Sequence, residues 1–406
     1  MQKKLWNKDF ILLFQSRAVS TIGDLMYSVA IGYWVYEVTG SSGLMGVMTS
    51  ISMFVTMFLS PFCGSIVDKC NRKWLMVGID AAQGLLMLAV GILAYMNVLS
   101  VPVVLVAAFL AALGSVFYGP AVSTLLLDII PREDMVRGQS LTSGMSTLID
   151  LVGTAFSGAM VAFFGVPLIV VINGLSNLYA AVSELFVRVP RTAQQGAKVT
   201  VKGILSDMYT AVKTVFSNPF LRLFVPSALV LNLLGAGPMT LILPFSMEKG
   251  FTVDMYGYLI ACFTAGQLLG VTVLGVVKIK PRVRYYLMSV GFTVSVVFFI
   301  LTYFSTRFVP MCAMAFMAAL CNCVGNAVFN ASLMLALPDE NRSSILGFIS
   351  AASVGGTALS TLIYGILGDV FPLYLNFAAG SFLSLAPMMY MCFHPRTRDF
   401  VLNHSK

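Results

Sequence analysis

The chain has 406 residues, of which 58% are hydrophobic and only 10% charged, and its mean hydropathy of +0.89 lies far above that of soluble domains. This composition excludes a soluble protein and predicts a polytopic membrane protein. The formal net charge of +8 does not indicate a nucleic-acid partner, because the basic residues stand in short loops between apolar segments, where they act as topology signals.

Twelve apolar segments, each long enough to cross the hydrocarbon core as a helix, follow one another along the chain. The first is too long for a signal peptide and lacks a cleavage site, so we expect it to be retained. The predicted spans are 10–37, 43–67, 74–97, 101–127, 137–163, 166–189, 220–247, 254–278, 284–305, 307–336, 343–369 and 372–393.

Lysine and arginine residues gather in alternate loops, from the basic N-terminus to the C-terminal tail. The opposite side of the membrane holds only Lys249 and Arg307. Because positive charge marks cytoplasmic loops, we expect a multi-pass cell-membrane protein with both termini in the cytoplasm.

The longest polar segment, 190–219, separates two sets of six spans. The two sets look like weak parallel copies, since Asn7 with Phe10–Phe14 corresponds to Asn218 with Phe220–Phe224. Such a repeat predicts an all-α membrane protein whose twelve transmembrane helices form two pseudo-symmetric halves around a central cavity. The expected parts are an N-terminal half (1–189), a cytoplasmic linker (190–219), a C-terminal half (220–393) and a cytoplasmic tail (394–406).

A short polar turn, Gly64-Ser65-Ile66-Val67-Asp68-Lys69-Cys70-Asn71-Arg72-Lys73, joins the second and third spans. Its spacing of glycine, acid and basic residues resembles the signature of the major facilitator superfamily of secondary transporters. Three basic residues alone would also suit a loop held in the cytoplasm, but that interpretation leaves Gly64 and Asp68 unexplained. The resemblance implies a gate that closes the cytoplasmic side, formed by Gly64, Asp68, Lys69, Arg72 and Lys73.

Two carboxylates, Asp24 and Asp150, lie near the middle of the first and fifth spans. A charge at the centre of a membrane helix costs about 2.5 to 3.5 kcal/mol on insertion scales, so such a residue is a functional candidate. We expect the two at similar depth, and our hypothesis is that Asp24, more than Asp150, carries a coupling proton or meets a cationic substrate. The alternative is that Arg17, on the same helix face, pairs with Asp24 and makes it a structural counter-ion. Acids near span ends, among them Asp80 and Glu184, are interpreted as interfacial.

Polar side chains that share the first span's face with Asp24 include Ser20, Tyr27 and Ser28. The second half offers amides instead of acids, and these can bind a substrate or join helix to helix. We therefore expect a mostly apolar cavity with scattered polar groups, suited to amphipathic ligands. The amide candidates are Asn232, Gln267, Asn322, Asn326 and Asn330.

The first half carries further stretches, namely Ser20-Thr21-Ile22-Gly23-Asp24, Val38-Thr39-Gly40-Ser41, Tyr118-Gly119-Pro120-Ala121 and Pro131-Arg132-Glu133. With the 64–73 turn they resemble the drug and macrolide efflux group of the superfamily, which includes siderophore exporters. This resemblance implies proton-coupled efflux of amphipathic small molecules by a single chain. Thr154 stands where such exporters often have a proline, so a proton-coupled importer of a nutrient on the same fold remains the alternative.

The sequence shows no nucleophile with a base and no phosphate-binding loop, so neither an enzyme nor a receptor is favoured. No ATP-binding motif occurs, and transport must then draw on an ion gradient. Seven cysteines and two histidines form no disulfide or zinc pattern, and no cofactor is expected. The expected partners are the substrate, protons and the lipid bilayer, with no nucleic acid.

Overall fold

The computed structural model describes residues 6–130, 135–188, 209–210, 212–276, 281–336, 342–395 and 397–398. In these residues all the regular structure is helical, and ten segments are long and apolar enough to cross a membrane. The first helix and the part of the fifth before Phe156, which carry Asp24 and Asp150, are not among the ten. The count of twelve spans therefore stays a prediction.

The chain divides into two compact units. Unit 1 comprises Met1–Gly40 and Ile51–Val201, and unit 2 comprises Ser41–Ser50 and Lys202–Lys406. Each unit has apolar clusters of buried side chains of its own, which include Leu125 in unit 1 and Phe224 in unit 2.

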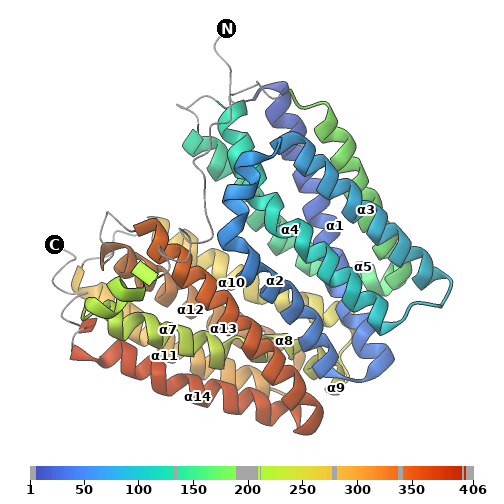
Figure 1. Cartoon of the computed structure of the whole chain (residues 1–406). Coiled ribbons are helices and arrows are strands. Elements are labelled where there is room, and N and C mark those ends of the chain that lie inside the picture. Colours follow the sequence, from blue (N-terminus) through green and yellow to red (C-terminus); the bar gives the residue numbers. More distant parts are fainter. Residues whose placement is uncertain are drawn as a thin grey trace. The chain divides into compact units, whose positions relative to one another are not determined.

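Unit 1 is built on α5, which consists of two helical segments, and two other helices pack against it. Helices α1 and α3 both lie along α5, and α4 lies along α3 (Figure 1). The bounds are α1 (Lys8–Thr39), α3 (Arg72–Tyr95), α4 (Val101–Ile129) and α5 (Met135–Leu185), while α2 (Ser42–Lys69) starts in unit 2 and continues in unit 1.

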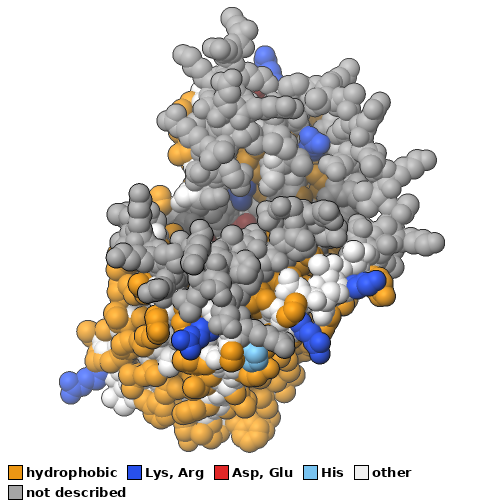
Figure 2. Space-filling model, turned by 90° about the vertical axis from the view of Figure 1, so that its left-hand side faces the viewer, with side chains coloured by type: hydrophobic (Ala, Val, Ile, Leu, Met, Phe, Trp, Pro, Cys, Tyr) orange, Lys and Arg blue, Asp and Glu red, His pale blue; other side chains and the backbone are white. Residues whose placement is uncertain are grey.

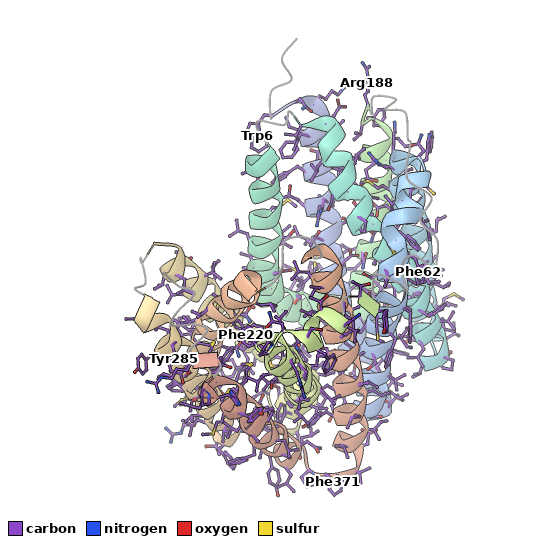
Figure 3. All side chains as sticks on the ribbon, turned by 60° about the vertical axis from the view of Figure 1, so that its left-hand side comes forward. Trp6, Phe62, Arg188, Phe220, Tyr285 and Phe371 are labelled. Atoms are coloured by element: carbon purple, nitrogen blue, oxygen red, sulfur yellow. The ribbon has the colours of Figure 1, made fainter. Side chains whose placement is uncertain are left out.

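Asn7 fixes the start of α1. Its side-chain oxygen accepts a hydrogen bond from the Phe10 amide at 2.8 Å, and its own amide donates to the Ile129 carbonyl at 3.1 Å. The first bond caps the helix, and the second ties it to the end of α4. Trp6 and Arg188 lie at this same end of unit 1 (Figure 3), where the Arg188 amide donates to the Asp9 carboxylate at 2.9 Å.

Helix α5 contains a break at Gly165. This residue has a φ of 74°, in the left-handed region that favours glycine, and Pro167 follows it. The break falls between the predicted spans 137–163 and 166–189. The element labelled α5 (Met135–Leu185) thus consists of two helical segments that meet at Gly165.

Unit 2 contains two groups of packed helices. Helix α12 packs on α10 and α11, and α7 packs on α13 and α14. Figure 2 shows that the visible face of this unit is dominated by hydrophobic side chains, as suits contact with lipid. The bounds are α7 (Leu221–Gly235), α8 (Gly237–Thr240), α9 (Ile242–Glu248), α10 (Val253–Val276), α11 (Pro281–Phe304), α12 (Phe308–Ala336), α13 (Arg342–Val370) and α14 (Leu373–Phe393).

The predicted span 220–247 is not one continuous helix, because it breaks into α7, α8 and α9. Pro238 lacks an amide donor, and Gly237 packs so closely on α13 that its amide donates to the Ser360 hydroxyl at 2.7 Å. A Cβ at Gly237 would lie only 2.5 Å from the Ser360 carbonyl oxygen. The helix is thus interrupted where it meets α13.

The start of α2 is capped by a carboxylate from α13, within unit 2. The hydroxyls of Ser41 and Ser42 donate to Asp369 at 2.5 and 2.9 Å, and the Gly43 amide donates to it at 3.1 Å. One turn farther along α2, a Cβ at Gly46 would be 3.0 Å from the Gly365 Cα, so the two backbones are in direct contact. In Figure 3, Phe371, which directly follows the end of α13, lies away from Phe220 and Tyr285.

Candidate functional site

Unit 1 encloses a cavity of about 210 Å³ that is open to the carboxylate of Asp24. Five helices line it with polar and small apolar side chains. The lining residues are Asp24, Tyr27, Ser52, Thr56, Gln83, Met87, Ala111, Ala112, Ser115, Asn173 and Asn177.

Two amides of α5 hold the Asp24 carboxylate. The Asn177 side chain donates to Asp24 Oδ1 at 3.2 Å, and Asn173 supplies a second side-chain hydrogen bond. Both amides are 1% exposed and lie one helical turn apart, whereas Asp24 itself is exposed where it faces the cavity. Gly23 allows this approach, because a Cβ there would collide with the Ser176 hydroxyl of α5.

Tyr27 stands one turn from Asp24 and lines the same cavity. Its hydroxyl is buried and has no hydrogen-bond partner among the described residues. Across the cavity, the Gln83 amide donates to the Ala111 carbonyl at 3.0 Å and to the Ser115 hydroxyl at 3.2 Å. The site thus combines one acid, a tyrosine hydroxyl able to bond a ligand, and amides held in place.

Three residues that the sequence groups with Asp24 do not line its cavity. Arg17 forms no ion pair with Asp24 among the described residues, and its charge acts instead on Tyr118 of α4. Ser28 is exposed and donates to the Leu25 carbonyl at 2.8 Å, and it does not line the cavity. Asp150 is exposed on α5 and is also absent from the lining residues.

Sequence reasoning missed a buried pair of acids. Asp80 of α3 and Glu184 of α5 are 3% and 2% exposed, so both side chains are buried inside unit 1. The sequence carried a signal for Asp80, since it shares a helix face with Gly84 and Gly91, which pack closely against α5. A polar residue on such a face points into the protein.

Unit 2 contains a second cavity, of about 320 Å³, with no charged residue among its described lining. The broken helix contributes Gly235, Ala236, Pro238 and Met239 to its wall. Phenylalanine, tyrosine and methionine side chains supply most of the remaining surface, and three asparagines and three serines supply the polar part. These polar residues are Asn232, Asn322, Asn326, Ser295, Ser381 and Ser384.

Two of the amides that the sequence singled out are joined to each other. The Asn326 side chain donates to the Asn322 side-chain oxygen at 2.7 Å, and Asn232 donates to the Ala228 carbonyl at 3.1 Å. The Asn326 side-chain oxygen and the Asn322 amide group have no further partner among the described residues, so a ligand can bond them. Gln267 is half-buried on α10 and does not line this cavity, and the Asn330 side chain lies outside the described residues.

The predicted 64–73 turn is shorter in the structure, because α2 continues to Lys69 and α3 begins at Arg72. Asn71 caps α3 by accepting from the Trp74 amide at 3.3 Å, and Arg72 begins that helix half-buried. The Lys73 ammonium group donates to the Leu185 carbonyl at 2.6 Å and so caps the end of α5. The predicted gate residues Gly64, Asp68 and Lys69 fall outside the residues whose side chains are described.

Comparison with known proteins assigns this architecture to a family. The profile of the family described as "Transmembrane secretion effector" matches residues 4–400. Macrolide efflux protein A of Streptococcus pyogenes is 23% identical over 186 residues, which are 46% of this chain and 46% of that protein. The chain therefore matches about half the length of that relative.

A longer match joins the chain to the multidrug efflux pump Tap of Mycobacterium tuberculosis, which is 23% identical over 386 residues, covering 91% of this chain and 89% of Tap. Among solved structures, a bacterial homologue of the human lysosomal transporter Spinster, in an inward-facing and unoccupied conformation, superposes with a TM-score of 0.71 at 14% identity. That superposition covers 100% of this chain and 98% of the homologue. At this identity the likeness shows a common fold.

Proposed function

The chain belongs to the transmembrane secretion effector family of major facilitator transporters, and on that premise we propose that it exports amphipathic small molecules in exchange for protons. The proposal includes twelve transmembrane helices in two six-helix halves, with both termini on the cytoplasmic side of the cell membrane. We propose the boundaries 1–189, 190–219, 220–393 and 394–406 for its parts, and a single chain as the working unit.

The observation that carries this proposal is the position of Asp24. Its carboxylate lies inside the helices of unit 1, faces a cavity, and is held by two buried amides that carry no charge. A carboxyl group that opens to a cavity and lacks a cationic partner can bind and release a proton as access to the cavity alternates. That is the requirement for coupling transport to a proton gradient.

The second cavity supports the substrate class. Its aromatic and methionine surface suits a large apolar group of variable shape, and its asparagines offer hydrogen bonds to a few polar atoms. The absence of charge among its described lining residues favours ligands that are mostly apolar over small ionic nutrients.

An accumulation assay tests the proposal. Cells that express the chain are loaded with ethidium, a cationic dye, and with erythromycin, a macrolide, with and without a protonophore. We expect expression to lower the accumulation of at least one compound, and we expect the protonophore and Asp24→Asn each to abolish that effect.

Glu37→Gln is the matched control, because it removes an exposed acid from the same helix and should leave export unchanged. Accumulation that rises on expression would contradict the proposal by reversing the direction of transport. Export that survives both the protonophore and Asp24→Asn would contradict the role of the proton gradient and of Asp24.

A further inference from the structure

We propose that Asp80 and Glu184 form a second proton site in unit 1, in which two buried carboxyl groups share one proton at neutral pH and exchange it with water as the pH changes. The inference deepens the proposed function and rests on it for its part in transport. The ligand of the site is a proton, and neither residue faces the cavity of Asp24.

The two side chains are placed to share a proton. The Asp80 and Glu184 carboxyl groups lie close enough to hydrogen-bond each other. Two carboxylates both accept and neither donates, so one of the pair must be protonated for this bond to exist. The Tyr118 hydroxyl donates to Glu184 Oε1 at 2.9 Å, which supports one negative charge on the pair.

Burial adds a second argument. Asp80 Oδ2 and Glu184 Oε2 are both buried, and no donor among the described residues reaches them. Two adjacent buried anions repel each other strongly, and a single proton removes that repulsion. The close approach of the two helices leaves little room for water, since a Cβ at Gly84 of α3 would lie 2.9 Å from the Gly174 carbonyl oxygen of α5.

The charged and titratable groups around the pair come from two other helices. From α1, Asp24 acts electrostatically on Asp80, and Arg17 acts on Tyr118. From α4, the contributing group is the Tyr118 hydroxyl itself. Among these described groups, the cation Arg17 is offset by Asp24, so together they do not supply the positive charge that a fully ionised pair would need.

The pair lies next to the turn that carries the predicted gate. Glu184 is followed by Leu185, whose carbonyl accepts the hydrogen bond of Lys73. When the proton leaves the pair, its O–H bond to the carboxyl group breaks, water accepts the proton, and the hydrogen bond between the two groups is lost. The charge of the pair then changes from −1 to −2. The Lys73 ammonium group contacts the residue that directly follows Glu184. The added charge therefore lies one residue from the contact between α5 and the turn.

Infrared pH titration of the purified full-length protein in lipid vesicles tests the site directly. The measured quantity is the carbonyl band of protonated carboxyl groups. We expect a band that is present at neutral pH and lost at alkaline pH, and that Asp80→Asn and Glu184→Gln each alter, whereas Glu37→Gln leaves it unchanged. Tyr118→Phe should change the pH at which the band is lost, because it removes the hydroxyl that bonds Glu184.

A neutral-pH band that survives both Asp80→Asn and Glu184→Gln unchanged, or that no change of pH removes, would overturn the inference. Thermal unfolding of each variant identifies any that fail to fold, and the Tyr118→Phe titration still tests the site if one acid variant is lost. Because the titration uses no substrate, it tests the proton site independently of the proposed export function. A titrating pair in a chain that exports no compound would leave this inference standing and remove the proposed function.

Discussion

The cavity of unit 1 contains a carboxylate, whereas the described lining of the cavity in unit 2 is neutral throughout. The first has fixed amides around one acid, and the second has aromatic and methionine side chains around a few free amide groups. A proton and an amphipathic molecule need opposite surroundings, because an ionisable group in an apolar pocket would weaken the binding of an apolar ligand. Under the proposed function, proton binding therefore falls to unit 1 and substrate binding to unit 2.

The largest effect is expected when an acid is placed in the neutral cavity of unit 2. We expect Asn326→Asp to reduce export of Nile red, a neutral dye, by roughly tenfold or more, since a buried carboxylate penalises apolar ligands. Export of ethidium, a cation, should fall much less. Asn326→Leu is the control that removes the amide without adding charge. Equal losses for the two dyes in Asn326→Asp would contradict the assignment of substrate binding to unit 2.

A smaller effect is expected when a hydrogen-bonding group is removed from the same cavity. Asn322→Leu should raise the half-saturating concentration of an exported macrolide roughly fivefold to tenfold, the equivalent of one hydrogen bond of about 1 kcal/mol or slightly more. The matched control is Gln267→Leu, an amide of unit 2 that does not line the cavity. A similar change in both variants would show that the cavity amides do not bind the substrate.

Removing the Asp369 cap is expected to lower the stability of unit 2 without changing which substrates are exported. Asp369→Ala removes the acceptor of three hydrogen bonds from Ser41, Ser42 and Gly43, and should lower the free energy of unfolding by about 1 to 2 kcal/mol. Thermal unfolding in detergent measures this loss. Asp369→Asn keeps one acceptor oxygen and should lose less, and both variants should keep the substrate preference of the wild type.

The smallest effect is expected at Lys249, which lies outside the membrane spans. Its ammonium group donates to the Tyr303 carbonyl at 2.8 Å and also to the Ser305 carbonyl, so it caps the end of α11. Lys249→Met should lower the free energy of unfolding by about 1 kcal/mol. Arg307→Met, which removes an exposed cation, is the control and should have no measurable effect.

The same lysine gives a pH test. Burial lowers the pKa of Lys249 from its usual 10.5, with the charge of Glu248 acting in the opposite direction. The native state then holds this proton less tightly than the unfolded chain, so stability should rise with pH between the lowered pKa and 10.5. Lys249→Met should lack this alkaline rise, and a rise that persists in the variant would assign it to another group.

Local patterns in the sequence predicted the features that depend on one helix. The Asn7 and Asn218 positions were matched as repeat partners, and each accepts hydrogen bonds from the first amides of the helix that follows it. The membrane cost of Asp24 likewise predicted an unusual residue, and the structure places it at a cavity. These features can be predicted from the sequence because a helix cap or a charge within an apolar segment involves only a few neighbouring residues.

The features that sequence reasoning missed depend on contacts between helices. Asp80 and Glu184 are separated by more than a hundred positions, and their pairing becomes visible only when α3 packs on α5. The interruption of the span 220–247 likewise depends on Gly237 meeting Ser360 of α13. The hydrogen bond between Asn177 and Asp24 also joins two helices, α5 and α1, so the sequence did not predict it.

The central claim, that export is coupled to protons through Asp24, is tested most directly in proteoliposomes that contain the purified chain and a pH-sensitive dye in their lumen. An ethidium gradient imposed across the vesicle membrane should drive protons in the opposite direction and change the lumenal pH. We expect Asp24→Asn to abolish the pH change and Glu37→Gln to preserve it. Ethidium movement with no pH change in the wild type, or an undiminished pH change in Asp24→Asn, would contradict the account.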